Sequence, residues 1–188
     1  MKFLRVLCGA AFLGLSSPAL ADDITDAMDA ARKSYQSGDM AGAKQSLDLA
    51  SQLVGQKNAE SFVALLPNPL PGWKAEQAQA TAIGAAMFGG ASAATRSYTN
   101  DKGDNIEVQI TGDSAMIMQF GPMINNPAMA GMLGKLIKIG DQRAIQTKEG
   151  DVTIVVANKF LVTVNGSGDA ASKLAYAQAI NVAKLAKM

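Results

Sequence analysis

Few side chains in this sequence could carry out chemistry, because the chain contains no histidine and a single cysteine, Cys8. Without histidine there is no Ser-His-Asp triad, no imidazole acid–base catalysis and no ordinary zinc or haem ligation. Carboxylate chemistry, a Ser-Lys pair and oxygen ligands for hard cations remain open, but no recognisable motif supports any of them. The sequence therefore predicts a protein that is not an enzyme and that uses no cofactor.

Three charged residues are the best candidates for an enzymatic alternative. Arg96, Glu107 and Asp113 would lie close together if strands at 95–99 and 105–111 pair. A hydrolase that uses carboxylate or Ser-Lys chemistry is therefore one alternative function. The more ordinary expectation for these residues is a solvated sheet face, because exposed strand faces usually carry polar and charged residues.

Methionine is concentrated in the uncharged stretch that opens segment 115–136. This segment carries five of the ten methionines, at positions 116, 118, 123, 129 and 132. They could be adaptable fillers between helix and sheet, or an apolar lip for a lipid-like ligand or a protein partner. A third interpretation is Cu(I) capture by the thioethers of Met116 and Met118, because soft sulfur ligands select that ion. A Cu(I)-binding periplasmic protein is thus a second alternative function.

A second uncharged segment, 81–94, is rich in glycine and alanine. Both segments are expected to connect strands, so they could come together at one end of the sheet and form the interaction surface. The candidate ligand- or partner-binding residues are Met87, Phe88, Met116, Met118, Phe120, Met123, Met129, Met132 and Trp73. Trp73 is expected to anchor the preceding linker, with ligand stacking as its alternative role.

The first 21 residues have the three parts of a secretory signal peptide. Lys2 and Arg5 precede an apolar stretch at 6–15, and Ala19-Leu20-Ala21 supplies small residues at the cleavage site. The apolar stretch is too short to span a bilayer. We therefore expect cleavage after Ala21, a periplasmic location and no transmembrane anchor in the mature protein.

Removal of the signal peptide changes the chemistry of what is left. It takes away Cys8 and two of the 17 basic residues but none of the 16 acidic ones, so the formal net charge goes from +1 to about −1. Nucleic-acid binding needs clustered basic residues that displace counterions, and the chain has no such cluster. The mature protein is expected to be free of thiols and not to bind nucleic acid.

Residues 22–64 are expected to form a helical hairpin. Apolar residues recur at helical spacing on both sides of Ser37-Gly38-Asp39, and Asp39 is placed to cap the second helix. The spacing resembles one tetratricopeptide unit, but a single unit cannot make the stacked groove of that repeat family. The hairpin is therefore expected to pack on the main domain or to support a homodimer. The proline-rich linker 65–73 follows, ending in Trp73.

Residues 74–188 are expected to form an α+β sandwich domain. Ile106, Val108 and Ile110 alternate with polar residues, as in a half-buried strand. Short turns between apolar runs indicate antiparallel hairpins. Further strands are expected at 136–139, 142–148, 152–157 and 160–164, one helix within 113–135 capped by Asp113 or Ser114, and a terminal helix from Asp169 to the end. The predicted fold class is α+β: an N-terminal helical hairpin followed by an antiparallel sheet flanked by helices.

Over residues 65–188 the order of elements resembles exported proteobacterial proteins of uncharacterised function. The strings that carry the resemblance are Pro71-Gly72-Trp73, Ser97-Tyr98, Ile106–Ile110 and Asn158–Val164. At the level of the fold the chain is similar to the PsbP/Mog1 α/β/α sandwich. The resemblance implies a binding or accessory module without catalytic activity, and it assigns no functional residue. The function expected from the sequence is accordingly that of a periplasmic, non-catalytic binding or accessory protein.

Overall fold

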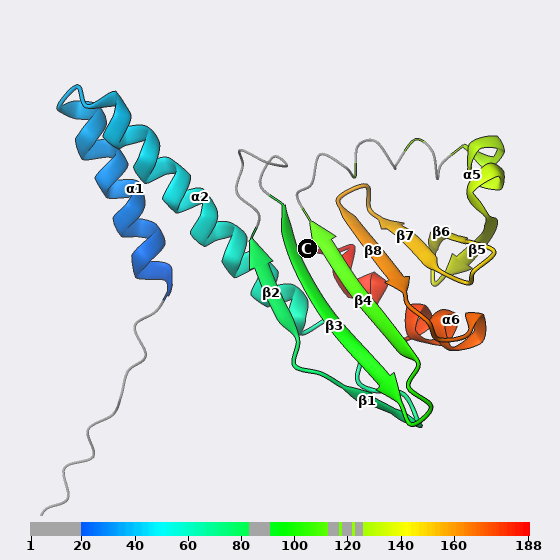
Figure 1. Ribbon diagram of the computed structural model, residues 1–188. Helices are drawn as coiled ribbons and strands as arrows, with labels where there is room; N and C mark the ends of the chain where they lie inside the picture. The colour runs from blue at the N-terminus through cyan, green and yellow to red at the C-terminus, as the bar shows by residue number, and fades with distance from the viewer. Residues whose placement is uncertain (1–19, 83–90, 113–116, 118–121, 123–125) are drawn as a thin grey trace, which may run out of the picture.

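The protein is described by a computed structural model that covers residues 20–82, 91–112, 117, 122 and 126–188 (Figure 1). Two helices at the N-terminal end precede an antiparallel sheet and further helices, so the predicted α+β fold class is confirmed.

The helical hairpin consists of α1 (Leu20–Gln36) and α2 (Met40–Val63). Gly38 provides the left-handed turn with φ of 83°, and the Asp39 carboxylate accepts a hydrogen bond of 2.9 Å from the Gly42 N–H. The predicted hairpin and its cap are confirmed. Small side chains fill the contact between the helices and let their backbones approach closely; the buried ones are Ala27, Ala31, Ala43 and Ala50.

Within the described residues the sheet has eight strands, in the order β1-β3-β4-β8-β7-β6-β5, with β2 also paired to β3. All pairings are antiparallel. The strands are β1 (Trp73–Ala75), β2 (Gln79–Ala82), β3 (Ser92–Asn100), β4 (Asn105–Gly112), β5 (Lys135–Ile139), β6 (Gln142–Gln146), β7 (Val152–Val156) and β8 (Phe160–Asn165). Consecutive strands are neighbours throughout 135–165, as expected from the short turns.

One face of the sheet carries the main core. Alternation along β4 buries Ile106, Val108 and Ile110, as predicted. The C-terminal part of α2, α6 (Ala170–Ala179) and α7 (Val182–Leu185) supply the opposing side chains. Phe62 of α2 belongs to this same core, so the hairpin and the sheet are packed together.

A second, smaller cluster lies on the other face of the sheet. Ala130 of α5 (Pro127–Leu133) packs there with Ile145 and Val155 of the sheet. Ile117, which precedes α5 in the chain, belongs to the same cluster. Val155 faces this cluster, whereas its neighbour Ile154 faces the main core. Strand β7 is therefore covered on both sides.

The terminal helix differs from the prediction. Asp169 caps α6 through a 2.6 Å bond from the Ser172 N–H, as expected, but Ile180 is extended and ends that helix. Asn181 then caps the short α7. The prediction of a single continuous helix was wrong. The break between α6 and α7 allows both Ile180 and Val182 to reach the core.

A helix, α5 (Pro127–Leu133), lies within the range 113–135 where one was expected. It is capped by Asn126, whose side chain accepts from the Ala128 N–H at 3.0 Å, and proline occupies its first turn. The expected caps Asp113 and Ser114 lie outside the described residues.

Two buried tyrosines hold the proline-rich linker in place, Tyr98 on β3 and Tyr176 on α6. Tyr98 donates to the Pro67 carbonyl at 2.6 Å, and the Tyr176 hydroxyl accepts from the Leu70 N–H at 3.2 Å. Trp73 packs edge-on against Tyr176, with ring centroids 5.7 Å apart. This is the anchoring contact expected of Trp73.

The buried tyrosines make folding sensitive to high pH. Burial raises the pKa of Tyr98 to about 12 and also raises that of Tyr176. Unfolded tyrosines ionise near pH 10, so above this pH the unfolded chain releases protons that the folded chain keeps. The contribution of the two protonated tyrosines to the free energy of unfolding is complete below pH 10 and is lost as the pH rises toward 12. We expect urea midpoints to fall over this interval.

The substitution Tyr98→Phe tests whether Tyr98 contributes to this loss of stability at high pH. It should remove part of the decline above pH 10, and it should cost about 1 kcal/mol at neutral pH because the bond to Pro67 is lost. Tyr35→Phe, at a position exposed in a single copy of the chain, is the matched control and should change neither value at protein concentrations where the chain is monomeric. A pH profile of Tyr98→Phe that matches the wild type would contradict the assignment.

Candidate functional site

The described parts of segment 81–94 lie beside the end of β4, the strand that precedes segment 115–136. Ala82, the last residue of β2, pairs with Ser92, the first of β3. Ser92 in turn pairs with Gly112, the last residue of β4. The connection after Ala82 and the chain after Gly112 therefore leave the sheet at neighbouring positions. Six of the candidate binding residues lie outside the described residues: Met87, Phe88, Met116, Met118, Phe120 and Met123.

This end of the sheet is tightly packed beneath α2. A side chain at Gly112 would approach the Phe62 ring to 2.8 Å and the Phe160 ring to 3.1 Å. Phe62 and Phe160 themselves meet edge-to-face, with centroids 5.6 Å apart. Residues 91–94 are all buried, including Ser92, whose hydroxyl makes no hydrogen bond to the described residues. These four residues belong to the core and offer no contact surface.

Helix α5 is where the Met-rich segment reaches the surface. Ala130 is buried against the sheet, but Met132 is 89% exposed and Met129 is 42% exposed. Leu133 and Leu136 are exposed to a similar extent as Met129. Spacings of three and four residues place Met129, Met132 and Leu133 on one side of the helix. We call Met129, Met132, Leu133 and Leu136 the α5 patch; its two methionines are not core fillers.

The structure does not bring all the candidate residues together. Trp73 pairs with Asn100 at the far end of β3, eight residues from Ser92 and roughly 27 Å away at strand spacing. Helix α5 contacts β5 and β6, which are separated from β2 and β3 by three other strands. Trp73, the α5 patch and the Ala82 end of the sheet are thus three separate places.

The expected closeness of Arg96 and Glu107 was wrong. The strands pair as predicted, but Arg96 lies opposite Val108 and Glu107 lies opposite Ser97. Side chains alternate along a strand, so Arg96 points to the main core and Glu107 to the other face. Arg96 donates to the Pro67 carbonyl at 3.3 Å, beside Tyr98, and serves the linker. Asp113 lies outside the described residues.

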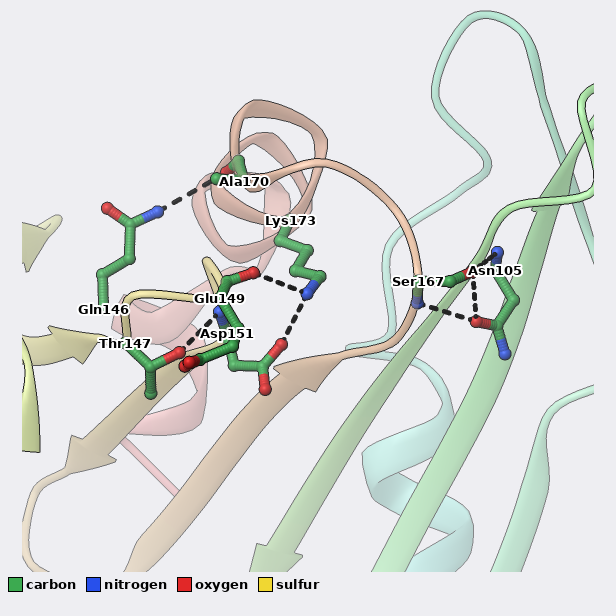
Figure 2. Close-up of polar contacts among 8 residues, drawn as sticks. All are labelled: Asn105, Gln146, Thr147, Glu149, Asp151, Ser167, Ala170 and Lys173. Atoms are coloured by element: carbon green, nitrogen blue, oxygen red, sulfur yellow. Dashed lines mark hydrogen bonds and ion pairs between the residues drawn. The ribbon is translucent and has the colours of Figure 1, made fainter.

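A buried lysine is the polar feature that the sequence interpretation missed (Figure 2). Lys173 of α6 is 3% exposed, and its Nζ contacts Asp151 Oδ1 at 2.6 Å and the Glu149 carbonyl at 3.0 Å. Figure 2 shows the side chain reaching from α6 to the β6–β7 turn. The signal was present in the sequence: positions 173, 176, 177 and 180 form a helical stripe that otherwise faces the core.

The surroundings of Lys173 explain its role. Its partners are a carboxylate and a backbone carbonyl, and no serine hydroxyl is among them. In the turn, Gly150 has φ of 87°, and a side chain there would meet Ala170 at 2.5 Å. Gln146 also donates to the Ala170 carbonyl, at 3.5 Å. The contacts fasten the start of α6 to the turn, and they do not constitute a Ser-Lys site.

The part of the chain that the structure describes also bears on metal binding and membrane insertion. No group of three acidic, cysteine or histidine side chains is placed to hold a metal ion there. Among the same residues no helix is long and apolar enough to cross a membrane. The Cu(I) hypothesis rests on Met116 and Met118, which lie outside the described ranges, and it stays a hypothesis.

Comparison of the chain with protein-family models, with curated proteins and with solved structures finds no match. The similarity to the PsbP/Mog1 sandwich stays a prediction from the order of elements.

The Lys173 contacts make a stability prediction. Lys173→Met keeps most of the buried stem but removes both hydrogen bonds, and Asp151, which is partly exposed, can be hydrated instead. We expect a loss of about 1–3 kcal/mol in the free energy of unfolding, measured by urea denaturation. Lys148→Met changes an exposed lysine in the same turn and should stay within about 0.5 kcal/mol of the wild type. Equal effects of the two substitutions would show that the buried contacts do not stabilise the fold.

Proposed function

We propose that the protein is a periplasmic, non-catalytic binding or accessory protein that contacts its partner through the α5 patch. The observation that carries this proposal is the exposure of four large apolar side chains on α5 and the start of β5. Clustered apolar side chains on a surface usually mark an interaction site.

The α5 patch is large enough to matter energetically. Four side chains of this size, three of them 41–43% exposed and Met132 89% exposed, present on the order of 400 Å² of apolar surface. Burial of that area would contribute about 10 kcal/mol before the costs of association, which are of similar size. The patch therefore suits a weak or moderate contact, to which the surrounding surface adds.

The type of contact follows from the element that bears the patch. Strand β5 lies at the edge of the sheet, but Lys135 and Lys138 are exposed on it, and edge lysines discourage the addition of another strand. Contact through side chains is therefore favoured. Met132 protrudes and is not enclosed, which favours an apolar protein surface over a small ligand held inside a cavity.

The structural contacts of two charged side chains, Arg96 and Lys173, support the proposal that the protein is not a catalyst. Arg96 is committed to the linker and faces away from Glu107. Lys173 is committed to the β6–β7 turn. The periplasmic location rests on residues 1–21 and their resemblance to a secretory signal.

Site-specific crosslinking tests the α5 patch. A photoreactive phenylalanine analogue is placed at position 132, or at Leu49 as an exposed apolar control on α2. We expect position 132, and not position 49, to give a discrete adduct in cells that express the full chain. The adduct should weaken when Leu136→Glu is added, because a charge is then buried in the contact.

Mass analysis of the adduct distinguishes the two kinds of partner. A protein adduct supports the proposal, whereas a lipid adduct would show that the patch binds a lipid-like ligand. The proposal is contradicted if position 132 gives no more adduct than position 49.

Export is tested by the first residue of the accumulated protein. Amino-terminal sequencing of the periplasmic fraction should find Asp22, because cleavage follows Ala21. Ala19→Lys places a long charged side chain where the peptidase requires a small one and should leave the signal uncleaved. Asp23→Asn, beyond the site, is the control. Recovery of an intact amino terminus from the wild type would rule out the signal peptide.

A further inference from the structure

We propose that a second copy of this chain docks on the helical hairpin, so that two hairpins pack into a four-helix bundle. The docking surface is a stripe of five apolar side chains, which we call the hairpin stripe: Met28, Tyr35, Met40, Leu47 and Val54. It is separate from the α5 patch and does not depend on the proposed function.

The five side chains share one side of the hairpin because of its geometry. Within the hairpin, α1 meets α2 through buried alanines, such as Ala27 and Ala50, and through their half-buried neighbours. In an antiparallel pair of helices, the residues that follow the contact positions on each helix point to the same side. Met28 follows Ala27 on α1, and Leu47 and Val54 follow half-buried Ser46 and Leu53 on α2.

The hairpin stripe is exposed and has the period of a helix-packing seam. Tyr35 is 64% exposed, Met40 63% and Leu47 57%. Residues 28 and 35, and residues 40, 47 and 54, are seven apart, which is the repeat that keeps apolar side chains facing a neighbouring helix. Figure 1 shows that α1 and the first part of α2 extend beyond the edge of the sheet. The sheet therefore leaves this part of the hairpin uncovered.

The charges beside the stripe suit another copy better than a membrane or a charged partner. Arg32 is paired with Asp29 at 3.2 Å, and Lys44 with Asp48 at 2.7 Å. Arg32 and Lys44 are thus each neutralised within their own helix. An anionic membrane would require free basic residues along the stripe. Two copies of a surface with balanced charge meet without net repulsion.

The area of the stripe reaches what a small dimer needs. Five large side chains, each roughly half exposed, offer on the order of 500 Å² per copy, or about 1,000 Å² in all. That is the lower limit for a specific interface, and the neighbouring polar residues add to it. Because the same surface serves both copies, the contact closes with twofold symmetry and does not continue into a chain of molecules.

Sedimentation velocity over a range of protein concentrations tests the dimer. The protein is purified in the form that a bacterial host accumulates. The wild type should pass from monomer to dimer as its concentration rises. Leu47→Glu should raise the dissociation constant by at least about tenfold, because the contact would bury a charge. Tyr35→Glu should act in the same way from the other helix.

Leu49→Glu is the matched control. Leu49 lies on the same helix and is 50% exposed, close to the 57% of Leu47, but it lies on the opposite side of α2 from the stripe. The control should dimerise as the wild type does, and circular dichroism should show that all variants are folded. A wild type that stays monomeric overturns the proposal. So does a dimer that survives both stripe substitutions, or one that Leu49→Glu disrupts equally.

Discussion

The contact on which the rest of the molecule depends is the one between Phe62 and Phe160, made over the bare backbone of Gly112. The two rings meet edge-to-face, and no side chain at position 112 would fit beside them. This contact seats the end of α2 on the middle of the sheet. A helix of 24 residues that is seated at its C-terminal end must extend past the sheet at its other end. The projecting hairpin is thus a consequence of where α2 is held, and α1 packs chiefly on α2.

The contacts between the linker and the tyrosines hold the chain that follows α2 against the same core. Leu65 and Leu66 continue the apolar surface of α2, and the next carbonyl, that of Pro67, accepts from both Arg96 and Tyr98. Proline-rich backbone has few donors of its own, so carbonyls of this kind need donors from elsewhere when they are buried. Arg96 and Tyr98 supply them from the core side of β3. What looks in the sequence like a catalytic cation is therefore a structural donor.

Local patterns in the sequence predicted most of the fold. Alternation at 106–110, the short turns between strands, and caps at Asp39 and Asp169 are all governed by residues close in the chain, and all are observed. The errors concern contacts between distant residues. The face on which Arg96 points depends on strand register, the break at Ile180 depends on the core that α7 fills, and the burial of Lys173 depends on a turn more than 20 residues away. For the candidate site, composition identified the Met-rich segment, but only the packing of Ala130 shows which side of α5 faces outward.

The pairing of Ala82 with Ser92 has a consequence for how this protein can vary in evolution. The two ends of the connection between them are held at facing positions by the sheet and by α2. A connection with fixed, adjacent ends costs little more chain entropy when it grows, about 0.6 kcal/mol for each doubling of its length. A longer connection between Ala82 and Ala91 would therefore add little to the entropic cost of folding, whereas Ala91 itself is buried and cannot be exchanged freely. A change in the number of residues at this point would leave the pairing of Ala82 with Ser92 in place.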